Sequence, residues 1–317
     1  MTKRSIGLVV MVLASAGQTC AASAAEGIRL QPHRAVYDLT LSKASSGSGM
    51  SEMNGRLVYE ITGAACEGYT QNMRFVTRAS SSDGSEQIND IRTSSFEEAT
   101  GERLDFSSTH HIDSQIQTTE GRAARTHSAR SSGAKPGPAK PGAAAQSGKP
   151  QSDNDANAKE KGAKEGSVKV DLVQPEPRQL SLPQTVYFPI QHSLALLGIA
   201  RNGGQLFVAD LYDGSENGDK VSATTTVIGK AGTEDKDDLP ANARGAMKGA
   251  RYWPIATSYF EQTKSLQSQD AVPSHEMSAR FYENGVSTKL VLDYGDFALK
   301  GELKEITFLP ESNCSGK

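Results

Sequence analysis

HEMSARFYENGVSTKLVLDYGDFALKGELKEITFL occupies residues 275–309, and this stretch decides the fold. Two segments of alternating polarity, 275–282 and 287–294, flank the dipeptide Asn284-Gly285. Asn-Gly supplies the positive φ angles that a tight β-hairpin needs. Gly295-Asp296 then reverses the chain into a third such segment, 297–309. The C-terminal part of the chain therefore predicts consecutive antiparallel strands.

The same alternation continues upstream, and glycine-containing turns separate the segments at residues 83–84, 100–101 and 213–214. The further predicted strands cover residues 35–41, 56–62, 69–77, 87–96, 168–173, 205–211 and 220–228.

One helix is credible, and it begins at Phe188-Pro189. Apolar residues recur at helical spacing up to Ala200, and Asn202-Gly203-Gly204 ends the helix. A single helix among many hairpins favours an all-β antiparallel barrel or open spiral over a βαβ architecture. We expect the helix to plug or cover the curved sheet.

The N-terminus predicts an export signal. Lys3 and Arg4 precede an apolar stretch at 6–16, and small residues allow cleavage after Ala24 or Ala25. The apolar stretch is too short to span a bilayer, and no later segment approaches the roughly 20 apolar residues that spanning needs. Cys20 leaves a lipoprotein alternative open. Residues 17–19 lack the small residue that normally precedes a lipid-modified cysteine, so a cleaved signal at 1–25 is favoured.

Cys66 and Cys314 are the two cysteines that remain after cleavage. An even pair in an exported protein predicts one structural disulfide. A redox switch is the alternative. The structural interpretation is favoured because there is no Cys-x-x-Cys motif and no nearby third thiol.

The charge balance gives no sign of nucleic-acid binding. The net charge is −3, and loss of Lys3 and Arg4 with the signal makes it −5. A nucleic-acid-binding protein would need a clustered basic face instead.

Residues 26–317 are expected to form one β domain that is interrupted at 119–166. This Pro/Gly/Ala/Lys-rich tract has no aromatic residue, leucine, isoleucine or valine, so it cannot bury enough apolar area to offset its ordering entropy. We therefore predict a disordered surface loop. Its nine basic and five acidic residues would also allow contact with an anionic envelope surface, but a tolerated insertion is favoured.

No sequence motif predicts catalysis. Gly-x-Ser-x-Gly, P-loop and His-Glu-x-x-His patterns are all absent. The stretch that begins at Asp153 starts like a calcium loop, but Ala158 replaces the turn glycine and Lys164 the bidentate acid.

The histidines also give no clear site. His111 and Asp113 would share a strand face and could hold a metal, but a solvated strand end is favoured. His33, His192 and His275 are dispersed and have no identifiable nucleophile partner. We expect no enzymatic activity, no cofactor and no bound metal.

Two clusters remain as candidate contacts for a ligand or partner. The stretch 210–216 could bring carboxylates to a sheet rim, although a routine turn is favoured. In residues 251–254 a cation stands beside aromatic residues and could stack at a groove, although a core tryptophan is favoured. The candidate contacts are Tyr212, Asp213, Glu216, Arg251 and Trp253.

Segments spread over nearly the whole mature chain carry a family resemblance. They are HRAVYDL (33–39), GRLVYE (55–60), ACEGY (65–69), RFVT (74–77), YDGSE (212–216), YENGV (282–286), LVLDYGDF (290–297) and LPESNC (309–314). In this order they resemble the EipB-type cell envelope integrity family of alphaproteobacterial periplasmic proteins.

The resemblance implies a highly bent antiparallel β-spiral, close to a broken barrel, with an accompanying helix. It also implies a disulfide between Cys66 and Cys314 and a periplasmic role in envelope integrity. The family has no established enzymatic reaction, so no catalytic residues are carried over. This chain departs from the family pattern at 119–166, which looks like an insertion between two strands.

The expected function is non-enzymatic maintenance of the cell envelope by binding an envelope protein or a lipidic ligand at a groove or exposed rim. A lipid or lipoprotein carrier is an alternative and would require an accessible apolar cavity. A hydrolase of envelope polymers is the alternative from another class, and it would require a tight cluster of carboxylates and histidine.

Overall fold

A computed structural model describes residues 27–126, 166–234, 239–261, 272–312 and 314. They form one helix, α1 (Pro189–Arg201), and a single fifteen-stranded sheet. The strands are β1 (His33–Ala44), β2 (Met50–Ala64), β3 (Gly68–Ser81), β4 (Glu86–Glu98), β5 (Arg103–Ile112), β6 (Gln115–Thr126), β7 (Ser167–Gln174), β8 (Arg178–Pro183), β9 (Leu206–Leu211), β10 (Ser222–Ile228), β11 (Gly232–Thr233), β12 (Arg251–Glu261), β13 (His275–Tyr282), β14 (Ser287–Asp293) and β15 (Phe297–Phe308).

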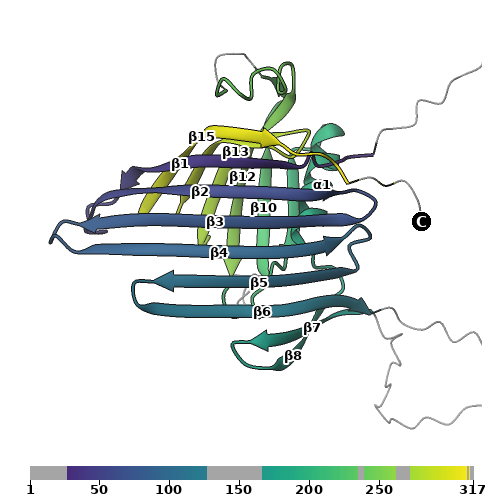
Figure 1. The fold of residues 1–317 in the computed structure, drawn as a ribbon, viewed down its shortest axis with the longest axis horizontal. Coiled ribbons are helices and arrows are strands. Elements are labelled where there is room, and N and C mark those ends of the chain that lie inside the picture. Colours follow the sequence, from purple (N-terminus) through teal and green to yellow (C-terminus); the bar gives the residue numbers. More distant parts are fainter. Residues whose placement is uncertain (1–26, 127–165, 235–238, 262–271, 313, 315–317) are drawn as a thin grey trace, which may run out of the picture.

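The sheet consists of two antiparallel meanders joined by the first and last strands. Its order is β8-β7-β6-β5-β4-β3-β2-β1-β15-β14-β13-β12-β10-β9, and β1 pairs with β15 along most of its length. Figure 1 shows the long strands β1–β6 crossing β10, β12 and β13 at a steep angle, so the sheet is sharply bent. The all-β, antiparallel fold class is confirmed.

The two edges of the sheet approach each other without forming a ladder. After β8, Tyr187 makes an isolated parallel bridge to Leu211 at the end of β9. The Tyr187 N–H donates to the Asp210 carbonyl at 2.7 Å, and the Tyr212 N–H donates to the Tyr187 carbonyl at 2.9 Å. One bridge instead of a continuous ladder leaves a broken barrel, as the family resemblance implied.

Helix α1 lies on the concave side of the sheet, and a side chain from a distant strand caps its N-terminus. Phe188 at the N-cap offers no side-chain hydrogen bond, and Pro189 starts the helix. Instead the buried Glu97 carboxylate of β4 accepts the Ile190 N–H at 2.7 Å and the Gln191 N–H at 3.0 Å. The predicted helix is confirmed, including its end at Asn202-Gly203, where Gly203 has a φ of 80°.

The buried side chains form two main clusters. The larger one packs α1 against the inner faces of β1, β2, β9, β10, β12 and β13. The second lies inside β5–β7 and includes Phe188 and Tyr212. Helix α1 and the two halves of the bent sheet are therefore held together mainly by the larger cluster.

Strands β5, β6, β8, β11 and β12 were not among those predicted, and β6 corrects the loop boundary. Residues 119–126 belong to this strand, whereas 119–166 was expected to be a loop. The inner face of β6 has room only for small residues. At Gly121, for example, a Cβ would lie 2.7 Å from the Phe106 ring, which is too close. Pairing with β5 and β7, which does not depend on large apolar side chains, holds the strand. Residues 127–165 of the tract and the predicted signal lie outside the described residues.

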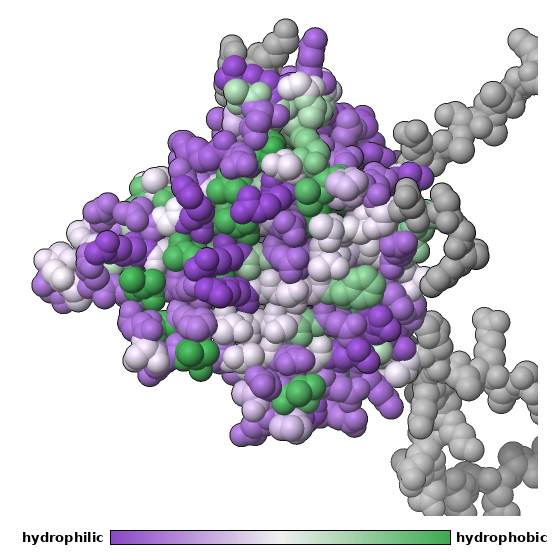
Figure 2. Space-filling model, viewed as in Figure 1, coloured by the Kyte–Doolittle hydropathy of each residue, from purple (hydrophilic) through white to green (hydrophobic). Residues whose placement is uncertain are grey.

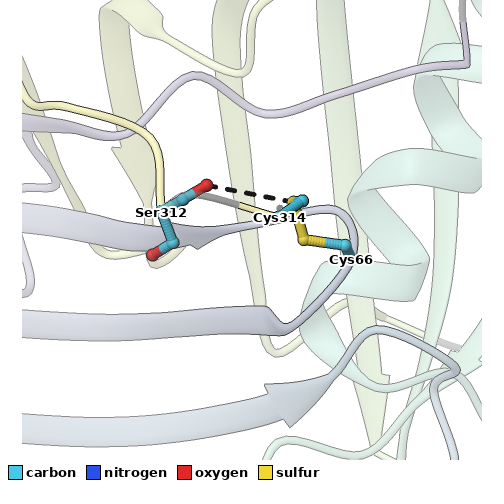
Figure 3. The surroundings of a disulfide bond; sticks show 3 residues. All are labelled: Cys66, Ser312 and Cys314. Atoms are coloured by element: carbon cyan, nitrogen blue, oxygen red, sulfur yellow. Dashed lines mark hydrogen bonds between the residues drawn. A yellow bond between two sulfur atoms is a disulfide. The ribbon is translucent and has the colours of Figure 1, made fainter. Parts of the chain in front are cut away.

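The expected disulfide is confirmed. Cys66 lies in the turn between β2 and β3, and Cys314 follows β15 (Figure 3), with a Cα–Cα distance of 6.0 Å. Since β1 lies between β2 and β15, the bond connects neighbours on both sides of the first strand. Among the described residues, no helix has both the length and the apolar character that crossing a membrane requires.

Candidate functional site

The concave side of the sheet holds two adjoining cavities. The vestibule, about 600 Å³, lies between the inner face of β2–β6 and the loop 212–221. The inner chamber, about 310 Å³, lies between α1 and the inner faces of β1–β3 and β12–β14. Tyr59, Gln71, Met73 and Pro189 line both cavities, so the two adjoin. Their volumes fall within the range of small-molecule sites, about 300–1,000 Å³.

The inner chamber is mainly apolar. Its walls include Leu57, Ile61, Leu196, Ile255, Phe281 and Leu290. Two histidines also line it, and burial lowers the pKa of each, that of His192 to about 4. Both histidines are therefore neutral at pH 7, and the chamber is suited to an apolar group.

A row of short polar side chains, which begins next to Met73, forms much of the sheet wall of the vestibule. Met73, Thr93, Ser108 and Thr119 are successive cross-strand partners on β3, β4, β5 and β6. Side chains alternate between the two faces of a strand, and cross-strand partners share a face. Three neighbouring hydroxyl groups therefore face the vestibule.

The residues that adjoin Met73 and Thr93 along β3 and β4 face outward, and they form ion pairs. Arg74 and Arg92 each bind Asp90 at 2.9 Å, and their guanidinium groups lower the pKa of Asp90 to about 2. Figure 2 shows this outer face, which is largely hydrophilic with scattered apolar residues. On β3 and β4 these ion pairs thus lie on the convex face, whereas Thr93 faces the concave side.

Tyr212 anchors the loop that forms the opposite wall. It is fully buried, its hydroxyl donates to the Gly218 carbonyl at 2.7 Å, and its ring packs edge-on against Phe106. The Thr119 hydroxyl donates to the Glu216 carbonyl, and Gln117 donates to Asn217 at 2.7 Å. The structure therefore places Tyr212 in the framework of the site and not on its surface.

Asp213 and Glu216, from the same cluster, do line the vestibule. Both are exposed. Asp213 accepts the Ser215 N–H at 2.9 Å, in the turn that the sequence favoured. Glu216 pairs with Lys220 at 2.6 Å, and Lys220 also binds Glu261 at 3.1 Å.

The second candidate cluster lies elsewhere. Trp253 is 4% exposed and belongs to the larger core cluster, as the core interpretation predicted. Arg251 lies over the Trp253 ring, 5.1 Å from its centroid, and pairs with Glu283 at 3.3 Å. Arg251 and Glu261 mark opposite ends of β12, about 30 Å apart for an extended strand. The structure does not bring the two clusters together.

The possible metal pair finds no support from neighbouring ligands. Asp113 accepts the Ile88 N–H at 3.2 Å. Within the described ranges, no group of three or more His, Cys, Asp or Glu side chains is arranged to hold a metal ion.

The sequence interpretation missed the hydroxyl row and the junction between the cavities. At the junction Gln71 donates to the Tyr59 hydroxyl at 2.7 Å, and burial raises the pKa of Tyr59 to about 12. The available signal was Thr-Ser-Ser at 93–95 and Ser-Ser-Thr at 107–109. Hydroxyl residues in two strands that pair across a turn predict a polar inner face.

Three comparisons place the chain among known proteins. The family model described as EipB-like matches residues 24–138 and 143–310. The cell envelope integrity protein EipB of Brucella abortus (strain 2308) is 34% identical over 291 residues, which cover 92% of this chain and 89% of that protein. A crystal structure of a β-barrel-like protein of domain of unknown function DUF1849 from Brucella abortus matches with a TM-score of 0.70 and 30% identity, over 90% of this chain and all of that one.

Proposed function

Because the chain belongs to the EipB-like family, we propose that it is a periplasmic, non-enzymatic protein that maintains cell envelope integrity by binding a lipidic ligand in its concave cavities. The single observation that carries the binding step is the apolar inner chamber that adjoins the vestibule.

The envelope role and the compartment rest on separate observations. The 34% identical relative is named a cell envelope integrity protein and matches almost the whole chain. The predicted signal and the disulfide both suit an oxidising compartment outside the cytoplasm.

The lipidic ligand follows from the lining of the inner chamber. Its walls combine aliphatic and aromatic side chains with two neutral histidines. Burial of an acyl chain is worth about 0.8 kcal/mol for each CH₂ group that leaves water. A protein partner on an outer surface would not need such a chamber.

The polar groups of the vestibule favour binding over hydrolysis. Its histidine, His110, contacts the Asn89 side chain at 2.6 Å and not a carboxylate. The Glu216 carboxylate is paired with Lys220. A hydrolase would need a histidine or carboxylate positioned as a base next to a nucleophile.

Affinity should rise with the length of the alkyl chain. We expect alkyl maltosides with eight, ten and twelve carbons, measured by calorimetry below their critical micelle concentrations, to gain about fourfold in affinity per CH₂ group. Ser193→Phe should fill the inner chamber and weaken the twelve-carbon ligand about tenfold or more, because Ser193 lines it from α1.

Ser193→Ala is the matched control, since it keeps the chamber open and should bind like the wild type. Thermal melting would confirm that both variants are folded. Equal affinity for all three chain lengths would contradict burial of the chain.

Loss of the protein should weaken the envelope. We expect a deletion strain to become sensitive to detergent and to cell-wall antibiotics, and the wild-type gene to restore growth. The Ser193→Phe gene should fail to restore growth, whereas Ser193→Ala should succeed. Wild-type resistance of the deletion strain would remove the integrity role.

A further inference from the structure

We infer that the vestibule selects the ligand by its head group, which is uncharged and rich in hydroxyls, such as a glycosyl or polyol group, and not an anionic phosphate. This inference rests on the proposed function, because it assigns the other half of the same ligand. The alkyl chain would occupy the inner chamber, and the head would lie against the wall formed by β4, β5 and β6.

The first observation is the charge of the lining. Among the described residues that line the vestibule, none is lysine or arginine, and two are carboxylates, Asp213 and Glu216. The adjacent cation, Lys220, already pairs with Glu216 and Glu261. The arginines of β3 and β4 lie on the opposite face of the sheet.

The second observation is the supply of hydrogen bonds. Thr93 and Ser108 are cross-strand partners, and neither hydroxyl has a hydrogen-bond partner among the described residues. A hydroxyl group both donates and accepts, so a pair of them matches the hydroxyls of a sugar or polyol. Asp213 adds a strong acceptor on the opposite wall.

The same lining is unfavourable for an anionic head group. Transfer of a phosphate from water requires cations or several donors to replace its hydration. Here the head would lose hydration and face two carboxylates instead. The same wall that satisfies a sugar therefore disfavours a phosphate.

The test compares ligands that share one chain and differ in the head. We expect n-dodecyl maltoside to bind the wild-type protein about tenfold more tightly than n-dodecyl phosphate in calorimetry at pH 7.5. Dodecyltrimethylammonium is the cationic arm. Its head can neither donate nor accept a hydrogen bond at Thr93 and Ser108, and Glu216 is already paired with Lys220, so it should also bind more weakly than the maltoside. Equal or tighter binding of the phosphate or the ammonium amphiphile would overturn the inference.

A pair of variants places the selectivity in the vestibule. Ser108→Lys introduces a cation on the concave face and should raise affinity for dodecyl phosphate about fivefold. Thr109→Lys, the next residue on β5, faces the convex side and should leave that affinity unchanged. The same gain in both variants would show general attraction and contradict a head-group site here.

Different results would contradict the proposed function and the head-group selectivity. If none of the dodecyl amphiphiles binds, the proposed lipid-binding function is wrong. If affinity follows chain length but is the same for every head group, only the head-group inference is wrong.

Discussion

Replacing Cys66 with serine is expected to lower the free energy of unfolding by about 2–5 kcal/mol in oxidising buffer. The disulfide closes a loop with a sequence separation of 248 residues, so it removes much of the freedom of the unfolded chain. The chain-entropy relation gives about 5 kcal/mol for a loop of this length, and measured gains are usually smaller. Urea titration followed by circular dichroism measures the change.

Reduction provides the control for this prediction. The wild-type protein in dithiothreitol should approach the stability of the variant, whereas the variant itself should not respond to the reductant. The Cys66→Ser/Cys314→Ser double variant should match the single one. An unchanged unfolding midpoint would show that the bond does not stabilise the fold.

The strands that the sequence predicts best are those whose inner face is apolar. In β13 and β14 buried residues alternate with more exposed ones, and Asn284-Gly285 fixes the turn between them. Here local turn chemistry and burial agree, so the pattern alone predicts the hairpin.

The strands that were missed have specific physical reasons. The inward residues of β5 include Ser108 and His110, which line a cavity and need not be apolar. Its alternation of hydrophobicity is therefore weak, and the sequence pattern of β5 did not predict a strand. The property that makes this face a candidate site is the one that concealed it.

Strand β12 was not predicted, and it contains Pro254, a residue that is disfavoured inside a sheet. The structure shows how the proline is accommodated. The Pro254 carbonyl accepts the Gly229 N–H at 2.7 Å, just beyond the end of β10. Its ring nitrogen faces the same edge, where β12 changes partner from β10 to β11. This exchange of partners depends on the whole sheet and is not visible in a local segment.

For a similar reason, the candidate contact residues at 212–216 include both a buried residue and exposed ones. The sequence placed Tyr212 with Asp213 and Glu216 in one polar turn, but a buried ring and an exposed carboxylate can alternate within such a turn. Tyr212 turns inward onto Phe106, and Asp213 faces the vestibule. Which neighbour contacts a ligand depends on packing against β5 and β6, and these strands are distant in sequence.

Glu97→Gln is expected to change how stability depends on pH, because Glu97 caps α1 from within the core. Burial raises the pKa of Glu97 from 4.5 to about 7. The Ile190 and Gln191 N–H donors and the charge of Arg125 lower the pKa, but their effect is smaller than that of burial. Between these pH values the folded protein holds a proton that the unfolded chain has lost. Wild-type stability should therefore fall, relative to the variant, as pH rises from about 4.5 to 7, by on the order of 3 kcal/mol.

His192 on the same helix acts in the opposite direction. Burial lowers its pKa from 6.5 to about 4, so the unfolded chain binds a proton that the folded protein does not. This contribution raises stability as pH rises from about 4 to 6.5. The two groups largely offset each other in the wild type. Compared with the wild type, the free energy of unfolding should therefore rise more steeply with pH in Glu97→Gln and rise less, or fall, in His192→Gln.

Urea titrations of the wild type and both variants at pH 4, 5, 6, 7 and 8 would measure these slopes. Differences between the curves isolate each group, because all other titrating groups are shared.

In Glu97→Gln the side-chain amide has one acceptor oxygen where the carboxylate has two. At pH 8, part of the gain from removing a buried charge is therefore lost to an unsatisfied helix N–H donor. Parallel curves for all three proteins would show that neither group titrates differently in the folded state. Pro189 and His192 line the inner chamber, so a displaced helix N-terminus should also weaken dodecyl maltoside binding in Glu97→Gln.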